Sequence, residues 1–352
     1  MKKVLVMALF IMGFALFAQD SKFMDYVPGD STGVGCINIK SLLKHPKLVE
    51  LIDTAEKKDK DFANFSKELS TDGFDIKNAF DSVCLFFNDD ASTPGGGALI
   101  QTSIPEDKLL KIIERTPDAQ NMVKSVVNGK NVYRFKDVDS AKDSAMTYLS
   151  PNIIALLDSN QMLDKVITVK KDQSISTNKT IMDMVNKAGK NHSAWLVFKM
   201  KEKNPTDKTK ESAETNPMFP VDEIKSGIFT LDLTGEKSDE ISMKLRLSCK
   251  QAEKAQLLTM QLQGYVSIFT GMFGQSNPKL SLDIANALKF SNEGNDVLIN
   301  ALVTSQLIDE IKKVAEQPPQ IFKPPQPGEG SGNTEEISEE IKIEEITVPA
   351  TE

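Results

Sequence analysis

The order of predicted strands and helices constrains the fold of this chain more than any single motif does. Strand, turn, strand, helix and strand occur twice, and their opening residues, Val83 and Ile228, stand 145 positions apart. A strand and two helices precede each set. Each half therefore fits a βαββαβ arrangement, the ferredoxin-like pattern. We predict an α+β fold of two ferredoxin-like pseudo-repeats with helices on antiparallel sheets, followed by a disordered C-terminal tail.

Composition and charge divide the chain into four segments. We predict a signal peptide at residues 1–18, a first α+β half at 24–140, a second at 145–316 and a disordered tail at 317–352. The tail is rich in Pro and Gly and then acidic, which favours disorder. It holds eight acidic residues and two lysines of a chain whose net charge is −8. The body is thus only mildly acidic and has no basic stripe, which argues against nucleic acid as a partner.

Residues 1–18 have the three parts of a bacterial export signal. Lys2 and Lys3 precede the 14 apolar or small residues Val4–Phe17, and Ala18 stands at the expected cut. This run is shorter than the ~20 apolar residues of a spanning helix. Leu16 occupies position −3, where a small residue is preferred, so an uncleaved N-terminal anchor is the alternative. We expect an extracytoplasmic protein, periplasmic or secreted, with no integral membrane span unless the signal stays uncleaved.

The residues that usually carry catalysis are sparse. The two histidines, His45 and His192, stand beside Pro46 and after a Gly-Lys-Asn turn, and both positions are typical of exposed turns. The run Gly95–Gly97 leads into a strand instead of a helix, so a hairpin loop explains it better than a phosphate loop. We expect no catalytic, metal or cofactor-binding residues and no enzyme activity. A carboxylate-based hydrolase is a lower-ranked alternative.

The three cysteines, Cys36, Cys84 and Cys249, each stand in a strand-like apolar stretch. Small buried core residues are the expected interpretation. A Cys36–Cys84 disulfide is the alternative, but the 4-1-3-2 strand order of a ferredoxin-like sheet places two strand spacings, roughly 9–10 Å, between them. That separation is too large for a disulfide.

The helix predicted from Gln251 to Phe273 has the most regular pattern in the chain. Its apolar residues follow 3-4-3-4 spacing, with further apolar residues off that stripe. A core helix that covers a sheet is one interpretation. The other is a wall of an apolar groove, formed by Leu258, Leu262, Tyr265, Phe269 and Met272. An envelope protein or an apolar ligand would then be the partner.

A resemblance to a protein group supports the same division. Tyr26–Thr32 before a strand, Ser41–Lys47 with its leucines, Thr71–Ile76 and the hairpin residues Gly129–Tyr133 resemble exported bacterial α+β proteins of unknown function. The resemblance covers most of the mature body. It implies an exported two-part protein and assigns no catalytic residue.

Two functional hypotheses follow from the sequence. The first is a non-enzymatic extracytoplasmic binding or scaffolding protein, with the acidic tail as a tether or docking strand. The second is a carrier of a hydrophobic ligand or lipid, in which the 251–273 helix forms one wall of a cavity.

Overall fold

The computed structural model describes residues 21–89, 95–135, 144–189, 192–200, 221–234, 239–274 and 277–315. The predicted signal peptide (1–18) and tail (317–352) lie outside these residues. The chain divides into two compact units, Met1–Lys312 and Lys313–Glu352. The first unit holds all the described strands.

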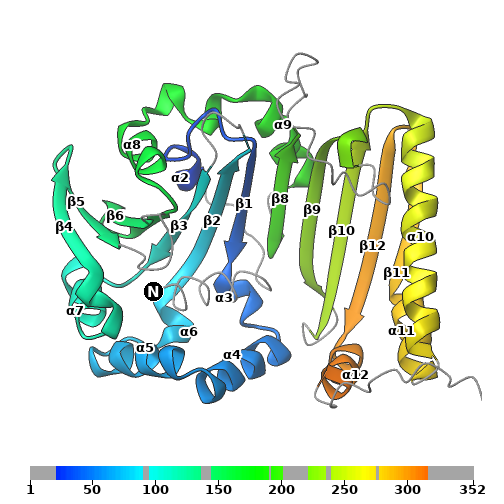
Figure 1. The fold of residues 1–352 in the computed structure, drawn as a ribbon, viewed down its shortest axis with the longest axis horizontal. Coiled ribbons are helices and arrows are strands. Elements are labelled where there is room, and N and C mark those ends of the chain that lie inside the picture. The colour runs from blue at the N-terminus through cyan, green and yellow to red at the C-terminus, as the bar shows by residue number, and fades with distance from the viewer. Residues whose placement is uncertain are drawn as a thin grey trace, which may run out of the picture. The chain divides into compact units, whose positions relative to one another are not determined.

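The described strands form one twelve-stranded sheet in which every neighbouring pair is antiparallel (Figure 1). The order along the sheet is β11-β12-β10-β9-β8-β1-β2-β3-β7-β6-β5-β4. The α+β class is therefore confirmed. The strands are β1 (Gly33–Asn38), β2 (Phe80–Asn88), β3 (Gly95–Thr102), β4 (Met122–Val127), β5 (Lys130–Phe135), β6 (Ser144–Ser150), β7 (Ile153–Leu157), β8 (Ala194–Lys199), β9 (Ile224–Thr234), β10 (Glu240–Cys249), β11 (Leu288–Glu293) and β12 (Asp296–Thr304).

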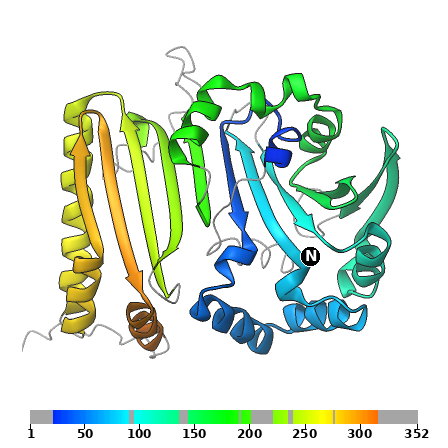
Figure 2. The ribbon, with the colours of Figure 1, turned by 180° about the vertical axis from the view of Figure 1, so that it is seen from behind.

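Eleven α-helices lie in the described part of the chain and pack on this sheet or at its ends (Figure 2). Helix α8 contacts β3, β7 and β6, α9 contacts β8 and β9, and α10 and α11 contact strands at the β11 end. The helices are α2 (Ser21–Met24), α3 (Ile39–Leu42), α4 (Pro46–Lys58), α5 (Lys60–Thr71), α6 (Ile76–Ala79), α7 (Glu106–Glu114), α8 (Asn160–Thr168), α9 (Lys179–Ala188), α10 (Ala252–Gly274), α11 (Pro278–Ala287) and α12 (Ser305–Ala315).

The predicted ferredoxin-like pseudo-repeats are not confirmed, and the 4-1-3-2 strand order is wrong. Strand β1 pairs directly with β2, and β2 pairs with β3. Helices α3 to α6 connect β1 to β2 without crossing to a parallel strand, since the two strands are antiparallel neighbours. Pairing of β3 with β7 and of β1 with β8 makes the sheet continuous across both sets of strands.

Turn and cap signals in the sequence predicted several local elements correctly. Asn128 and Gly129 both adopt positive φ and join β4 to β5, as a two-residue hairpin turn requires. Pro46 begins α4, and Gly73 follows α5 with φ of 84°. Pro105 precedes α7, and no described side chain caps that helix.

The cysteine distance argument is also wrong. Cys36 and Cys84 are register partners on adjacent antiparallel strands, and both are 0% exposed. Asn38 N donates to Ser193 O and Lys199 N donates to Thr32 O, so the even-numbered residues of β1 bond toward β8. Cys36 and Cys84 are therefore a non-hydrogen-bonded pair, a class in which facing Cα atoms are typically about 4.5 Å apart.

Candidate functional site

The first half of α10, which carries the predicted groove, packs on the sheet through its inner side. Leu258 is 1% exposed and belongs to a small core cluster with Ala255, Leu247 and Val297. Leu262 is half-buried against the same cluster. The apolar side chains of β10 and β12 therefore fill the space beneath this half of the helix.

The second half of the predicted groove is more open. Tyr265 is half-buried, whereas Phe269 is 49% exposed. The side chain of Met272 lies outside the described residues. The predicted stripe thus begins in a packed core and ends at the surface.

The opposite side of α10 carries a second apolar stripe, which faces solvent. Leu257, Met260 and Ile268 are 45%, 61% and 63% exposed. Gly264 and Gly271 lie on the same side, and a Cβ added at either would meet nothing within 4 Å. We name Leu257, Met260, Gly264, Ile268 and Gly271 the outer stripe. The sequence places Leu257, Met260 and Ile268 off the predicted groove, and only the structure shows that they are exposed.

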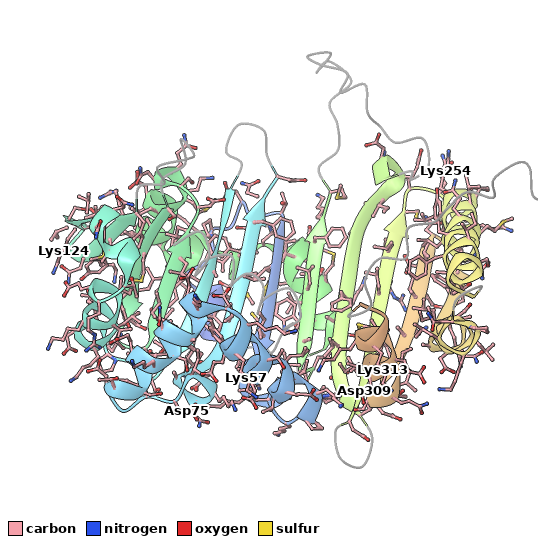
Figure 3. The ribbon with its side chains drawn as sticks, turned by 60° about the horizontal axis from the view of Figure 1, so that its bottom comes forward. Lys57, Asp75, Lys124, Lys254, Asp309 and Lys313 are labelled. Carbon is pink, nitrogen blue, oxygen red and sulfur yellow. The ribbon has the colours of Figure 1, made fainter. Side chains whose placement is uncertain are left out.

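The outer stripe lies on a helix with no charge over most of its length. The twenty residues Ala255–Gly274 include no Asp, Glu, Lys or Arg. Lys254 lies at the N-terminal end of the helix (Figure 3) and pairs with Glu223 at 3.6 Å. In the described part of the chain, no helix is both long enough and apolar enough to span a bilayer.

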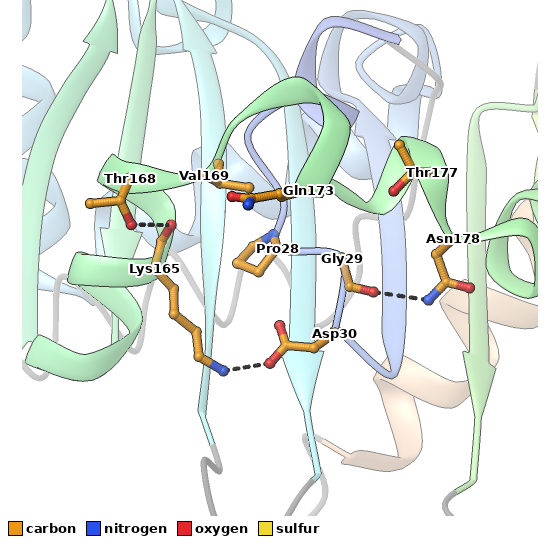
Figure 4. A pocket seen from close by; sticks show the side chains of 9 residues that line it. All are labelled: Pro28, Gly29, Asp30, Lys165, Thr168, Val169, Gln173, Thr177 and Asn178. Atoms are coloured by element: carbon orange, nitrogen blue, oxygen red, sulfur yellow. Dashed lines mark hydrogen bonds and ion pairs between the residues drawn. The ribbon is translucent and has the colours of Figure 1, made fainter.

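An open cleft of about 480 Å³ lies between the segment before β1 and the segment from α8 to α9 (Figure 4). Its lining mixes polar, charged and apolar groups. The lining residues are Pro28, Gly29, Asp30, Lys165, Thr168, Val169, Gln173, Thr177 and Asn178.

Polar groups of this cleft bond to one another. Lys165 Nζ lies 2.5 Å from Asp30 Oδ2, and Asn178 Nδ2 donates to Gly29 O at 3.0 Å. Gly29 N donates to Gln173 O, and a Cβ on Gly29 would stand 2.7 Å from that oxygen. These contacts therefore hold the segment before β1 against the residues from α8 to α9. Gly29 allows the close approach of the two backbones, because it has no Cβ.

His192 is not the exposed turn residue that the sequence predicts. Its side chain is 25% exposed and lies between the end of α9 and β9. Nδ1 lies 2.6 Å from Asp232 Oδ2, and Nε2 lies 2.6 Å from Ala188 O. Each ring nitrogen thus faces an oxygen atom of a different element of the fold. His192 thus connects two elements, and both of its ring nitrogens are engaged.

The prediction for His45 is also wrong, because His45 is 0% exposed. Its Nδ1 accepts from Lys47 N at 3.2 Å and caps α4. Within the described part of the chain, Nε2 has no hydrogen-bond partner. Burial disfavours the charged imidazolium, so the pKa of His45 is lowered from its ordinary value, even though the nearby Asp239 opposes this effect.

Two of the described carboxylates, Asp72 and Asp75, have structural partners. Asp75 caps α6 by accepting from Lys77 N at 3.0 Å. Asp72 pairs with Arg115. The paired neighbour of Asp89, Asp90, lies outside the described residues. Among those described, no group of three or more His, Cys, Asp or Glu residues is placed to hold a metal ion.

Comparison with known proteins gives a distant structural likeness only. No protein-family model matches the chain, and no curated protein matches it. Crystal form III of a protein named TP0453 aligns over 83% of this chain and 97% of that chain, with 10% identity and a TM-score of 0.45. Crystal form IV of TP0453 covers 82% and 95% with 11% identity and a TM-score of 0.43. The name TP0453 states no function.

Proposed function

We propose that this protein is a non-enzymatic extracytoplasmic binding or scaffolding protein and that the outer stripe of α10 is its contact surface. The observation that carries the proposal is the exposure of Leu257, Met260 and Ile268 along one side of an uncharged helix. Single exposed apolar residues are ordinary on a protein surface, whereas a continuous apolar patch marks an interaction site.

The chemistry of the stripe fits contact with a protein. Protein interfaces are depleted in charged residues at their centre and enriched in Met and aromatic residues. Met260 is flexible and polarisable, and Leu257 and Ile268 add branched apolar surface on either side. The export signal predicted at residues 1–18 supports an extracytoplasmic location for this contact.

A carrier of a hydrophobic ligand or lipid is the second candidate, and the exposed Phe269 favours it. Leu258 weakens this candidate, because it is packed against β10 and β12 where the ligand would have to enter. The scaffold proposal uses the opposite side of the helix, which is open.

Photo-crosslinking in the producing cell tests the proposal. A photoreactive amino acid replaces Ile268 in the full chain, and a matched control replaces Lys244, which is exposed on the polar side of β10. We expect the extracytoplasmic fraction to contain protein crosslinks from position 268 that disappear when Leu257→Glu is added. Position 244 should give none of these products.

Two results would overturn the proposal. The first is retention of the chain in the cytoplasm. The second is the absence of crosslinked protein from position 268, or the same products from position 244. Crosslinks to lipid alone would favour the carrier instead. Unchanged melting temperatures of the variants show that lost crosslinks do not reflect unfolding.

A further inference from the structure

The outer stripe of α10 is nearly symmetric about Gly264. Leu257 and Gly271 stand seven residues to either side of it, and Met260 and Ile268 stand four residues to either side. At 3.6 residues per turn, seven residues return to within about 20° of the same side and four to within about 40°. A two-fold axis through Gly264 therefore exchanges one half of the stripe with the other.

We propose that two copies of the chain pair through the outer stripes of α10, antiparallel, with Gly264 opposite Gly264. This pairing rests on the proposed function and names the partner of that surface. Leu257 of one copy then lies over Gly271 of the second copy, and Met260 lies against Ile268. A large side chain thus meets a glycine at each end of the pair, and two apolar side chains meet between these ends. An isologous dimer requires this kind of self-complementarity.

The two glycines carry an independent argument for a helical partner. Among the described residues, a Cβ at Gly264 or Gly271 would meet nothing within 4 Å, so their packing within one copy does not require glycine there. Glycine in a helix interior is less favourable than alanine. Glycine at these two positions is instead favourable at the contact between two copies. Small residues there allow the two helices to approach closely and leave room for the facing leucine.

Electrostatics favours a second copy over a lipid surface. An antiparallel pair places the positive end of each helix dipole beside the negative end of the other. Helices that bind at a membrane surface usually carry Lys and Arg beside their apolar side. Ala255–Gly274 has neither. This stretch therefore offers anionic lipid no cation, whereas pairing with the same stretch of a second copy places no like charges opposite one another.

The surface that the two α10 helices would bury is small, so the dimer is expected to be weak. A helix of 23 residues is about 34 Å long at 1.5 Å per residue. A contact strip about 10 Å wide then buries roughly 350 Å² per copy, compared with about 800 Å² in a standard interface. The dimer is therefore reversible and depends on concentration.

Sedimentation velocity of the exported protein tests both the pairing and its register. The wild type should shift from monomer to dimer between about 5 and 500 µM. Met260→Lys alone and Ile268→Glu alone should each stay monomeric throughout this range. An equimolar mixture of these two variants should dimerise again, because the new lysine of one copy faces the new glutamate of the other.

Two further variants separate pairing from folding. Gly264→Leu should not lower the melting temperature, because leucine has the higher helix propensity, yet it should abolish the dimer by filling the two-fold contact. Gln263→Lys places a charge on an exposed residue beside the stripe and should dimerise like the wild type.

The outcomes distinguish this inference from the proposed function. A wild type that is monomeric at every concentration, a dimer that survives Gly264→Leu, or a mixture that stays monomeric would each overturn the pairing. If the wild type is monomeric while position 268 still gives protein crosslinks in the cell, the pairing fails and the proposed function stands. If the wild type dimerises in solution but gives no crosslink in the cell, the pairing stands and the proposed function fails.

Discussion

Leu257 and Leu258 are neighbours in the sequence and point about 100° apart around α10, one outward and one into the core, so alanine substitutions at these two positions test the orientation of the helix. Leu258 is 1% exposed and packed in a core cluster, whereas Leu257 is 45% exposed. Leu258→Ala removes three buried carbons worth about 0.8 kcal/mol each, and the remaining cavity adds to this loss. We expect the free energy of unfolding to fall by about 3 kcal/mol.

Leu257→Ala should cost much less. About half of the Leu257 surface is already in water, no enclosed cavity forms, and alanine is the better helix former. The expected loss is within about 1 kcal/mol. The two variants should therefore differ by about 2 kcal/mol although they remove the same atoms.

Urea unfolding followed by far-UV circular dichroism measures this difference. Samples at about 1 µM keep any dimer dissociated. Fluorescence of Trp195, which is 0% exposed in the main core, reports whether the whole unit unfolds together. Equal losses for the two variants, or a larger loss for Leu257→Ala, would refute the orientation of α10 and with it the outer stripe.

Three other predictions concern features that the sequence left open or that it placed wrongly. Gly29→Ala should lower the free energy of unfolding by about 1–3 kcal/mol, because its Cβ would stand 2.7 Å from a carbonyl oxygen; Gly264→Ala, with open space around it, should cost nothing in the same urea assay. Burial lowers the pKa of His45, so the unfolded chain takes up the proton more readily. Stability should therefore fall as pH drops below about 6.5, by at most about 1.4 kcal/mol per pH unit. His45→Asn, which keeps a helix-capping side chain, should flatten this dependence, and an unchanged slope would contradict the assignment. Cys36 and Cys84 should form a disulfide when the chain refolds with oxidised glutathione, because register partners of a non-hydrogen-bonded pair lie within disulfide range; peptide mapping that finds two unmodified thiols would contradict this register.

Local elements could be predicted from the sequence because their causes are local. The Asn128-Gly129 turn determines its own hairpin, and Pro46 marks the first turn of its helix. Strand order has no such local cause. Helices α3 to α6 between β1 and β2 are compatible with a crossover to a parallel strand and with a return to an antiparallel neighbour. The sequence pattern is compatible with both connections. The strand order depends on contacts between distant segments, such as the pairing of β1 with β8, more than 150 residues away.

Only part of the candidate site could be predicted from the sequence, for a similar reason. The 3-4 spacing in α10 correctly groups Leu258 and Leu262, but spacing alone gives no direction relative to a sheet. His45 illustrates the same limit, since a histidine before proline resembles an exposed turn residue. It is buried, and Asp239, almost two hundred positions later, lies close to it. Burial by distant segments has no signature in a short window of sequence.

A comparison with edge strand β4, at the opposite end of the sheet, explains why α10 is the better surface for association between two copies. Edge strand β4 also exposes apolar residues, with Val123 at 49% and Val126 at 67%. Lys124 stands between them, over the ring of Tyr133. If two copies joined their β4 strands around a two-fold axis, their Lys124 side chains would approach each other, and like charges across strands are unfavourable. A charged edge strand is a known protection against such pairing. The outer stripe of α10 carries no comparable charge, so association between copies meets less opposition there than at the open edge of the sheet.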